Sequence, residues 1–409
     1  MYLKKAYNYS FLGIATFPLF SIKTATKFIA LWVLFSIIIL LKEKSWRSLR
    51  KTDIKSIFIL STFYLVLLGN YFFSGFDASV LKFLETDALF IVFPLFIFIN
   101  REYFGKETLQ RSLVVFFLAN TMLALICWAK VYSIGYTELA AENNFYKPTF
   151  RNLFSDTSGI HLPYLGLLFT FSIFIGIFWV RKAKGKVYAK AMVILICLVL
   201  LLSIATFSAR MSLISFLAIS IYILLCTLSG IKQKVLGIVI MLSLGALIVF
   251  TTPIKSRIDG ALDNFSLPSL AQNDTPHEVN LRYGIYYCTI QNIKENFFFG
   301  VGKQNSQDKL QACYNTFTYS GVNDFTKVTY NSHNQYLDVF LAYGFFGFLI
   351  ITVSFFCGFF VRPNLLYSVF LLLIAMALLT ENIFDRQVGV MFYTLFNTLF
   401  FLNQNRIHN

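Results

Sequence analysis

Long apolar stretches separated by short polar connections run through most of the chain. About twelve of them are long enough to cross a bilayer, because a spanning helix needs roughly 20 mostly apolar residues. The predicted spans are 8–22, 26–41, 54–73, 84–99, 111–133, 159–180, 188–207, 211–229, 234–252, 335–360, 364–380 and 387–403. This pattern predicts an all-α polytopic membrane protein.

A long polar stretch between the ninth and tenth spans predicts a large external loop. Within it, residues 279–296 are expected to form an amphipathic helix on the outer membrane surface, ended by a turn at Gly300 and Gly302. The chain is therefore divided into nine spans over 1–252, the loop over 253–334, and three spans with a short tail over 335–409.

The distribution of positive charge predicts the orientation of these spans. Loops that carry Lys and Arg stay inside, so both termini are expected to be cytoplasmic. The inside set is Lys4, Lys5, Lys42, Lys44, Arg47, Arg50, Lys51, Lys55, Arg101, Lys106, Arg111, Arg181, Lys182, Lys184, Lys186, Lys190, Lys232, Lys234, Arg362 and Arg406.

Composition narrows the class of protein further. The chain is 57% hydrophobic with a net charge of +15, and a soluble protein of 409 residues could not bury so much apolar surface. The cations lie in short loops, without a basic stripe interleaved with stacking aromatics, so no nucleic-acid partner is expected. The expected partners include membrane lipids.

The polar residues suited to chemistry fall on the predicted external face. They come from several separate loops and are Arg151, His161, Arg210, Arg282, His333, Glu381, Asp385 and Arg386. Solvated loop charges would not be expected to gather on one face, so this convergence predicts a site that opens outward.

Residues 331–347, NSHNQYLDVFLAYGFFG, place His333 and Asn334 at the mouth of an apolar helix. In one continuous helix Gly344 would lie on the face of His333, about 16 Å along the axis, where Gly344 and Gly347 would let another helix approach closely. The helix dipole disfavours the imidazolium, which suits His333 as a general base, and Asn334 is expected to orient the ring or a substrate hydroxyl.

Two arginines are candidates for binding an anion. Arg210 follows an apolar run and Arg282 begins the predicted loop helix. A guanidinium fork matches phosphate oxygens, whereas the alternative is an arginine that snorkels to the interface. The first external loop has no acidic residue and no CxxC or HxxxH spacing occurs, so neither a metal ion nor another cofactor is expected.

The six cysteines divide into two groups. Cys127, Cys197, Cys226 and Cys357 fall in predicted spans, where a small apolar side chain explains them. Cys288 and Cys313 share the external loop, where a disulfide between them is a hypothesis.

The pattern His333-Asn334, nine residues, Gly344, two residues, Gly347 resembles the signature of the bacterial O-antigen ligase and polymerase superfamily. The likeness includes the twelve-span layout, the large loop, an arginine in a Ser-Ala-Arg tripeptide and an arginine that begins the loop helix. It implies a GT-C type enzyme of the bacterial inner membrane whose loop and site face the periplasm.

The resemblance also implies a reaction. Such an enzyme moves a glycan from undecaprenyl diphosphate, a ligase to a lipid A-core sugar and a polymerase to a second lipid-linked repeat unit. Arg210 and Arg282 would bind the pyrophosphate and His333 would activate the acceptor hydroxyl in an inverting, metal-independent transfer. Asn334, Arg151, His161 and Arg386 are further candidates for supporting or acceptor-side residues, and the role of the region around His161 stays open. The ligase is favoured, the polymerase stays open, and a secondary transporter is the alternative of another class.

Overall fold

The computed structural model describes residues 2–20, 22–134, 148–182, 187–207, 209–251, 281–317, 325, 328–361 and 363–405. These residues form helices and connections without any strand, so the all-α prediction is confirmed for them. The expected inside cations Lys184, Lys186, Arg362 and Arg406 lie outside the described residues.

The first half of the chain forms eleven of the α-helices described. These helices are α1 (Tyr2–Ile14), α2 (Ile22–Glu43), α3 (Lys51–Leu60), α4 (Thr62–Phe73), α5 (Ala78–Asp87), α6 (Leu89–Ile99), α7 (Lys106–Ile134), α9 (Pro148–Ser158), α10 (Leu162–Lys182), α11 (Val187–Thr206) and α12 (Arg210–Thr227). Short 3₁₀ turns at Ser45–Ser48 and Arg101–Tyr103 join neighbouring helices.

The second half carries six more helices. They are α13 (Ile231–Thr251), α15 (Leu281–Glu295), α16 (Lys303–Tyr314), α18 (Gln335–Phe355), α19 (Leu365–Leu378) and α20 (Gln387–Asn405). Two further 3₁₀ turns lie at Cys357–Val361 and Ile383–Asp385. A helix is therefore present within the predicted range 279–296, as α15, while its amphipathic character and its place on the outer membrane surface stay predictions.

By length and composition alone, six of the described helices could cross a membrane, or seven if the bent pair α3 and α4 counts as one span. Helix α18 is one of the six, although it is folded at Gly344, as described below. The protein is therefore a multi-pass membrane protein, while the number twelve stays a prediction. Three of the expected spans are not single straight helices. In the span 8–22, α1 ends at Ile14; in the span 54–73, α3 and α4 meet at 64°; and in the span 84–99, α5 is followed by α6 after Ala88. Hydropathy detects apolar length but not such bends.

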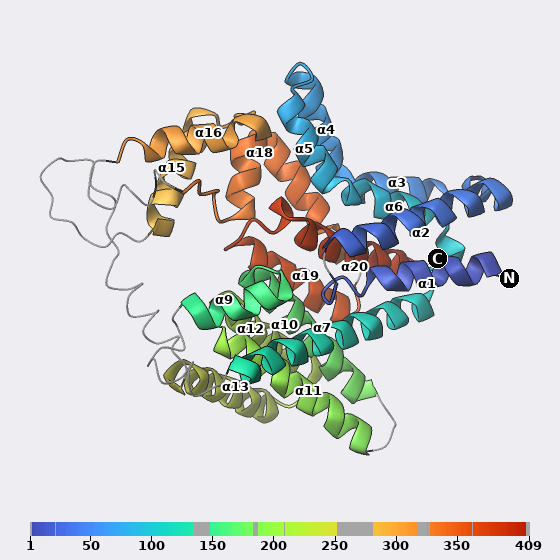
Figure 1. Ribbon diagram of the computed structural model, residues 1–409, viewed down its shortest axis with the longest axis vertical. Helices are drawn as coiled ribbons and strands as arrows, with labels where there is room; N and C mark the ends of the chain where they lie inside the picture. Colours follow the sequence, from blue (N-terminus) through green and yellow to red (C-terminus); the bar gives the residue numbers. More distant parts are fainter. Residues whose placement is uncertain are drawn as a thin grey trace, which may run out of the picture.

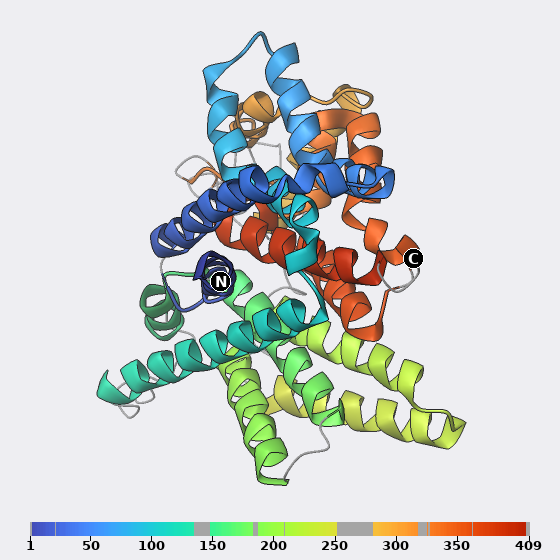
Figure 2. The ribbon, with the colours of Figure 1, turned by 90° about the vertical axis from the view of Figure 1, so that its right-hand side faces the viewer.

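Helix α20 forms the centre of the molecule, as Figures 1 and 2 show. It packs against α6, α7, α10 and α19 and is buried along most of its length. Two of its buried polar side chains are paired: Tyr367 of α19 donates to Asn397 Oδ1 (2.8 Å), and Asn397 donates to the Tyr393 hydroxyl (3.0 Å). Buried polar groups that pair in this way carry little desolvation penalty, so they can fix the register of an otherwise apolar bundle.

The helices run between two faces of the molecule. Figure 1 shows the N-terminal end of α1 and the C-terminal part of α20 on one side (right), with α9 and α15 on the opposite side. This arrangement accords with two termini on the same side of a membrane. Which side is cytoplasmic remains a prediction from the charge distribution.

Helix α18 is folded back on itself at Gly344. The rings of Tyr336 and Phe356 lie 6.4 Å apart, although 20 residues of straight helix would separate them by about 30 Å. The rings of Phe340 and Phe348 stack at 5.1 Å across the same fold. The expected single span over 335–360, with Gly344 on a continuous helix below His333, is therefore wrong.

Candidate active site

The unusual backbone of Gly344 produces the fold in α18. Its φ of 64° and ψ of −169° belong to a region that only glycine occupies readily. A Cβ there would lie 2.4 Å from the backbone of Phe298 and Phe299. The segment that approaches Gly344 is therefore the backbone turn after α15, not another helix as the sequence predicts. At Gly347 a Cβ would meet only Tyr343 of the same helix and, at 4.0 Å, Val66.

The turn after α15 satisfies backbone groups that the break in α18 releases. Val301 N and Gly302 N donate to the carbonyls of Leu341 and Ala342, both at 2.9 Å. Phe345 N donates to Phe297 O at 2.8 Å. Such pairing is required for irregular backbone in apolar surroundings, since an unpaired buried N–H or C=O is costly. The external loop is therefore joined directly to α18.

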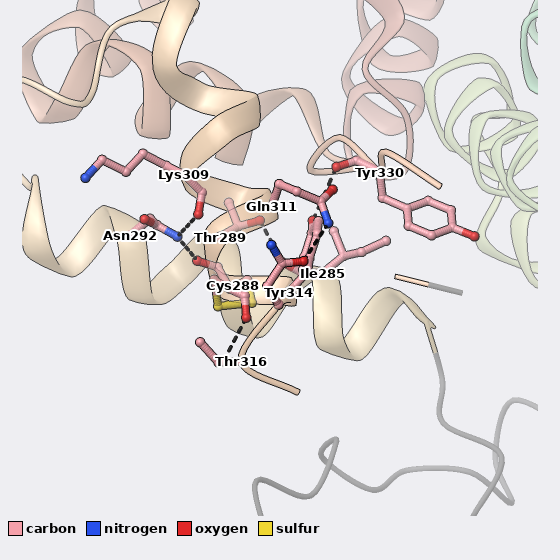
Figure 3. Close-up of a disulfide and its surroundings, with 11 residues drawn as sticks. Ile285, Cys288, Thr289, Asn292, Lys309, Gln311, Tyr314, Thr316 and Tyr330 are labelled. Atoms are coloured by element: carbon pink, nitrogen blue, oxygen red, sulfur yellow. Dashed lines mark hydrogen bonds between the residues drawn. A yellow bond between two sulfur atoms is a disulfide. The ribbon is translucent and has the colours of Figure 1, made fainter. Parts of the chain in front are cut away.

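Helices α15 and α16 form a hairpin closed by the disulfide between Cys288 and Cys313, which Figure 3 shows. The predicted pairing is thus present. Ile285, Leu310 and Tyr314 pack around it in a small core of their own. A cross-link over 25 residues contributes about 3–4 kcal/mol in the chain-entropy account. The hairpin holds Arg282 at the start of α15 and Lys303 at the start of α16.

His333 lies just outside the N-terminus of α18. Asn334 is the N-cap, and its side-chain oxygen accepts from Tyr336 N (3.0 Å) and Leu337 N (3.1 Å). His333 has a φ of 45°, in the left-handed region, and its N–H donates to Asn331 Oδ1 at 3.1 Å. Asn334 thus caps the helix rather than orienting the ring.

Glu381 brings Arg282 and His333 together. Its Oε1 lies 3.3 Å from an Nη atom of Arg282, and its Oε2 lies 3.6 Å from Nδ1 of His333. The Glu381 side chain is 14% exposed and that of His333 is 27% exposed. The 3.6 Å separation is too long for a hydrogen bond, and His333 Nδ1 has no hydrogen-bond partner among the described residues. The carboxylate lies on the Nδ1 side of the ring, so Nε2 is the atom considered for a substrate proton.

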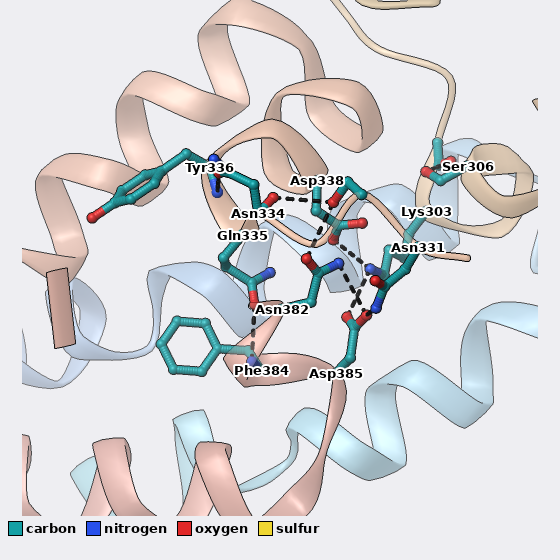
Figure 4. A network of polar contacts seen from close by, with 12 residues as sticks. Lys303, Ser306, Asn331, Asn334, Gln335, Tyr336, Asp338, Asn382, Phe384 and Asp385 are labelled. Atoms are coloured by element: carbon teal, nitrogen blue, oxygen red, sulfur yellow. Dashed lines mark hydrogen bonds and ion pairs between the residues drawn. The ribbon is translucent and has the colours of Figure 1, made fainter. Parts of the chain in front are cut away.

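A second polar network lies beside this cluster and is centred on Lys303, as Figure 4 shows. The ammonium group lies 2.6 Å from Asp338 Oδ2 on α18 and 3.2 Å from Asp385 Oδ1. Asn331 and Asn382 both donate to Asp385 Oδ2, at 2.9 and 3.2 Å. Lys303 therefore ties α18 to the loop that carries Glu381, and Asn331 ties the segment before His333 to the same loop.

Two neighbouring carboxylates stabilise the protonated, positively charged form of Lys303. Burial would lower the pKa of Lys303, but the carboxylates of Asp338 and Asp385 raise it well above its usual value of 10.5. Because the folded pKa exceeds the unfolded one, the stabilisation by this group is fully present below pH 10.5 and is lost only as the pH rises through the folded pKa.

Lys303→Met is expected to lower the free energy of unfolding by about 3–5 kcal/mol, because two carboxylates lose their cation in a largely buried site. Denaturation of the purified protein at neutral pH measures the loss. Lys309→Met on the exposed side of α16 is the matched control and should change stability by less than about 0.5 kcal/mol. Equal effects of the two changes would contradict the role assigned to Lys303.

Three other predicted residues lie around the same end of the bundle. His161 precedes α10, and its ring lies 6.1 Å from that of Tyr164. Arg386 lies over the same tyrosine ring, 5.9 Å from its centre. Tyr164 donates to Asn382 O at 2.7 Å, which joins α10 to the loop of Glu381. His161 and Arg386 are therefore close to the cluster without contacts to His333.

Arg210 and Arg151 complete the predicted set. Arg210 is exposed at the first residue of α12, where Ala209 and Ser212 pack against Gly166 in the second turn of α10. It therefore lies at the same end of α10 as His161. Arg151 lies on α9, and its side chain is outside the described part of the structure.

Sequence reasoning grouped Glu381 and Asp385 with the external polar residues but assigned them no role, and it passed over Lys303 and Asp338. Asp338 carried a usable signal, since an acid in an apolar helix commonly has a partner or a function. Lys303 lies directly after the turn at Gly300 and Gly302. The sequence around it does not predict its partners, because Asp338 and Asp385 lie 35 and 82 residues away along the chain.

Comparison with known proteins gives an independent result. Residues 198–352 match the family described as O-Antigen ligase. The matched segment runs from α11 to α18 and includes Arg210, Arg282, His333, Gly344 and Gly347, whereas Glu381 lies beyond it. No curated protein matches the chain. The resemblance drawn from the pattern at His333 is confirmed by this match over residues 198–352, which supports the O-antigen ligase and polymerase superfamily.

Proposed function

We propose that the protein is an O-antigen ligase-type glycosyltransferase of the bacterial inner membrane. It moves a glycan from undecaprenyl diphosphate to a lipid A-core sugar hydroxyl on the periplasmic face. The observation that carries the proposal is the cluster of His333, Glu381 and Arg282 beside the broken helix α18. A base, a carboxylate that orients it and a phosphate-binding cation are the groups that such a transfer needs.

His333 acts as the base in this proposal. Nε2 takes the proton of the acceptor hydroxyl, and the hydroxyl oxygen forms a bond to the anomeric carbon of the glycan. The bond from that carbon to the diphosphate oxygen breaks, and undecaprenyl diphosphate leaves with the bonding electrons. Attack from the side opposite to the leaving group inverts the anomeric centre. Glu381, whose Oε2 lies 3.6 Å from Nδ1, balances the charge that the ring acquires.

Arg282 and Arg210 bind the diphosphate. A guanidinium donates two parallel hydrogen bonds to phosphate oxygens and keeps its charge at any physiological pH. The described structure pairs Arg282 with Glu381, so the diphosphate competes with this carboxylate for the arginine. Arg210, from the start of α12, is the second donor-side cation.

Glu381→Gln is expected to lower kcat by about 10²–10⁴-fold, because a neutral amide no longer balances the positive charge that the base acquires. KM for the donor should not rise, since the competitor for Arg282 has lost its charge. Steady-state kinetics with the lipid-linked donor separates the two quantities. Glu295→Gln, an exposed acid at the end of α15, should leave both unchanged. A rise in donor KM at unchanged kcat would contradict the assigned role of Glu381.

Arg210→Lys should weaken donor binding by about tenfold or more, because an ammonium cannot reproduce bidentate contact with phosphate. Isothermal titration with a diphosphate donor measures the change. Arg111→Lys, at an exposed position in the second turn of α7, is the matched control. If the Arg210 variant bound the donor with unchanged affinity, Arg210 would not be a phosphate ligand, and the alternative of an arginine that snorkels to the membrane interface would hold.

Purified protein in liposomes, given an undecaprenyl-diphosphate glycan, tests the whole proposal. Transfer to added lipid A-core supports the ligase. Growth of the glycan on a second lipid-linked unit identifies the polymerase instead, and movement of the intact lipid across the bilayer without transfer identifies a transporter. Undiminished transfer in the presence of EDTA is expected for a metal-independent reaction.

A further inference from the structure

The turn between α15 and α16 carries three consecutive phenylalanines, Phe297, Phe298 and Phe299, which are 42%, 58% and 82% exposed. The sequence places this turn, residues 296–300, inside a large loop in water. Three adjacent aromatic side chains with this much exposed surface are unexpected there, since water-exposed loops are typically polar. The turn is referred to below as the aromatic turn.

The aromatic turn is stacked on α18. The rings of Phe297 and Phe345 lie 5.7 Å apart and almost parallel, and Phe298 and Phe299 lie 6.2 and 6.0 Å from Phe346. An exposed apolar stripe continues from there along the second arm of α18. It comprises Phe346, Leu349, Ile350 and Val353, each between 49% and 54% exposed. The turn and the stripe form one continuous surface.

This surface has the chemistry of a lipid contact. No charged residue occurs between Asn296 and Gly302 or between Phe345 and Val361. Phe297 O, Val301 N and Gly302 N are all paired with α18, and Gly300 N donates to Asn296 O at 2.9 Å. Backbone that is already paired can enter hydrocarbon at a low cost.

Charged residues border the surface where an interface would place them. Lys294 and Glu295 are exposed at the end of α15, directly before the turn. Aromatic rings flanked by a cation whose long stem can reach the headgroups are typical of segments at the membrane interface.

A second exposed aromatic tip lies nearby. Phe72, Phe73 and Phe76, between α4 and α5, are 54%, 95% and 60% exposed. Asn70 of α4 accepts from Lys303 N at 2.9 Å and donates to Gln304, so this tip is joined to the start of α16 just beyond the aromatic turn. Two apolar tips held side by side favour insertion into a lipid layer.

We propose that the aromatic turn inserts into the acyl-chain boundary of the leaflet on the side of His333. The α15–α16 hairpin is then a re-entrant element anchored in lipid, not a freely solvated loop. Helix α15 extends about 20 Å from this anchor to Arg282, so the anchor sets where that arginine lies relative to the headgroup layer. This inference does not depend on the reaction catalysed.

A nitroxide spin label at Phe299→Cys tests the proposal in the whole protein, reconstituted in phosphatidylethanolamine and phosphatidylglycerol vesicles. Cys127, Cys197, Cys226 and Cys357 are first replaced by alanine, and the disulfide is retained. Accessibility to oxygen, which concentrates in lipid, is compared with accessibility to a water-soluble nickel chelate. Lys309→Cys on exposed α16 is the aqueous reference, and Leu118→Cys on α7 is the lipid reference.

The expected result is a label at position 299 that resembles the one at 118, with nickel accessibility several-fold below that at 309. Nickel accessibility equal to that at 309 would place the turn in water and overturn the proposal. Low accessibility to both reagents would also overturn it, because the turn would then be covered by protein. A second label in place of Phe298 should give the same pattern as position 299.

Discussion

Replacement of His333 by asparagine is expected to reduce glycan transfer by about 10²–10⁴-fold, the usual contribution of a positioned general base. Asparagine tests the catalytic role more directly than alanine does, because it tolerates the left-handed backbone conformation that His333 adopts. His333→Ala should lose as much activity and, in addition, some stability from strain at this φ. Rates with a saturating lipid-linked donor measure both variants.

The comparison of these two variants separates catalysis from folding. Both should reach the membrane, and the asparagine variant should melt close to the wild type. Donor affinity should be nearly unchanged, since the proposed phosphate contacts come from Arg210 and Arg282. If the asparagine variant retained transfer at more than a tenth of the wild-type rate, another group would have to be the base.

Gly344→Ala is expected to destabilise the protein by about 3 kcal/mol or more. The added methyl would meet the backbone of Phe298 and Phe299 at 2.4 Å, and the φ and ψ of this position exclude ordinary side chains. Since backbone cannot rotate out of the way as a side chain can, the turn and α18 would have to separate. Thermal denaturation in detergent measures the loss.

Gly69→Ala on α4 is the matched control for this experiment. A Cβ at Gly69 meets nothing within 4 Å, and alanine is the better helix former by up to about 1 kcal/mol. This variant should be as stable as the wild type or slightly more so. A Gly344 variant of wild-type stability would show that α18 is able to run straight through this position.

The sequence predicts apolar length well and helix shape poorly. The regions 111–133, 159–180, 188–207 and 211–229 correspond to the long helices α7, α10, α11 and α12. The fold in α18 was missed, because Gly344 occupies a pattern that looks helical on both sides. Hydropathy cannot detect the break at Gly344, because the break is stabilised by backbone hydrogen bonds to the turn after α15, which lies more than 40 residues away in the sequence.

The site was predictable in part for a similar reason. His333 and Arg282 each stand at the beginning of a helix, which a local pattern can reveal. Their meeting through Glu381 depends on contacts across 99 and 48 residues, and those follow from the packing of α15, α18 and the loop before α20. The role of Lys303 depends in the same way on burial, which turns an ordinary loop lysine into a link between two carboxylates.

The hydrogen bonds between residues 297–302 and α18 have a consequence for building hybrid enzymes. An external loop is the obvious segment to exchange between related proteins when a new acceptor specificity is sought. A graft that ends at residue 334 would bring in a foreign turn and leave behind the broken helix that receives it. The natural unit of exchange extends through both arms of α18, to Phe355, so that the turn and Gly344 are inherited together.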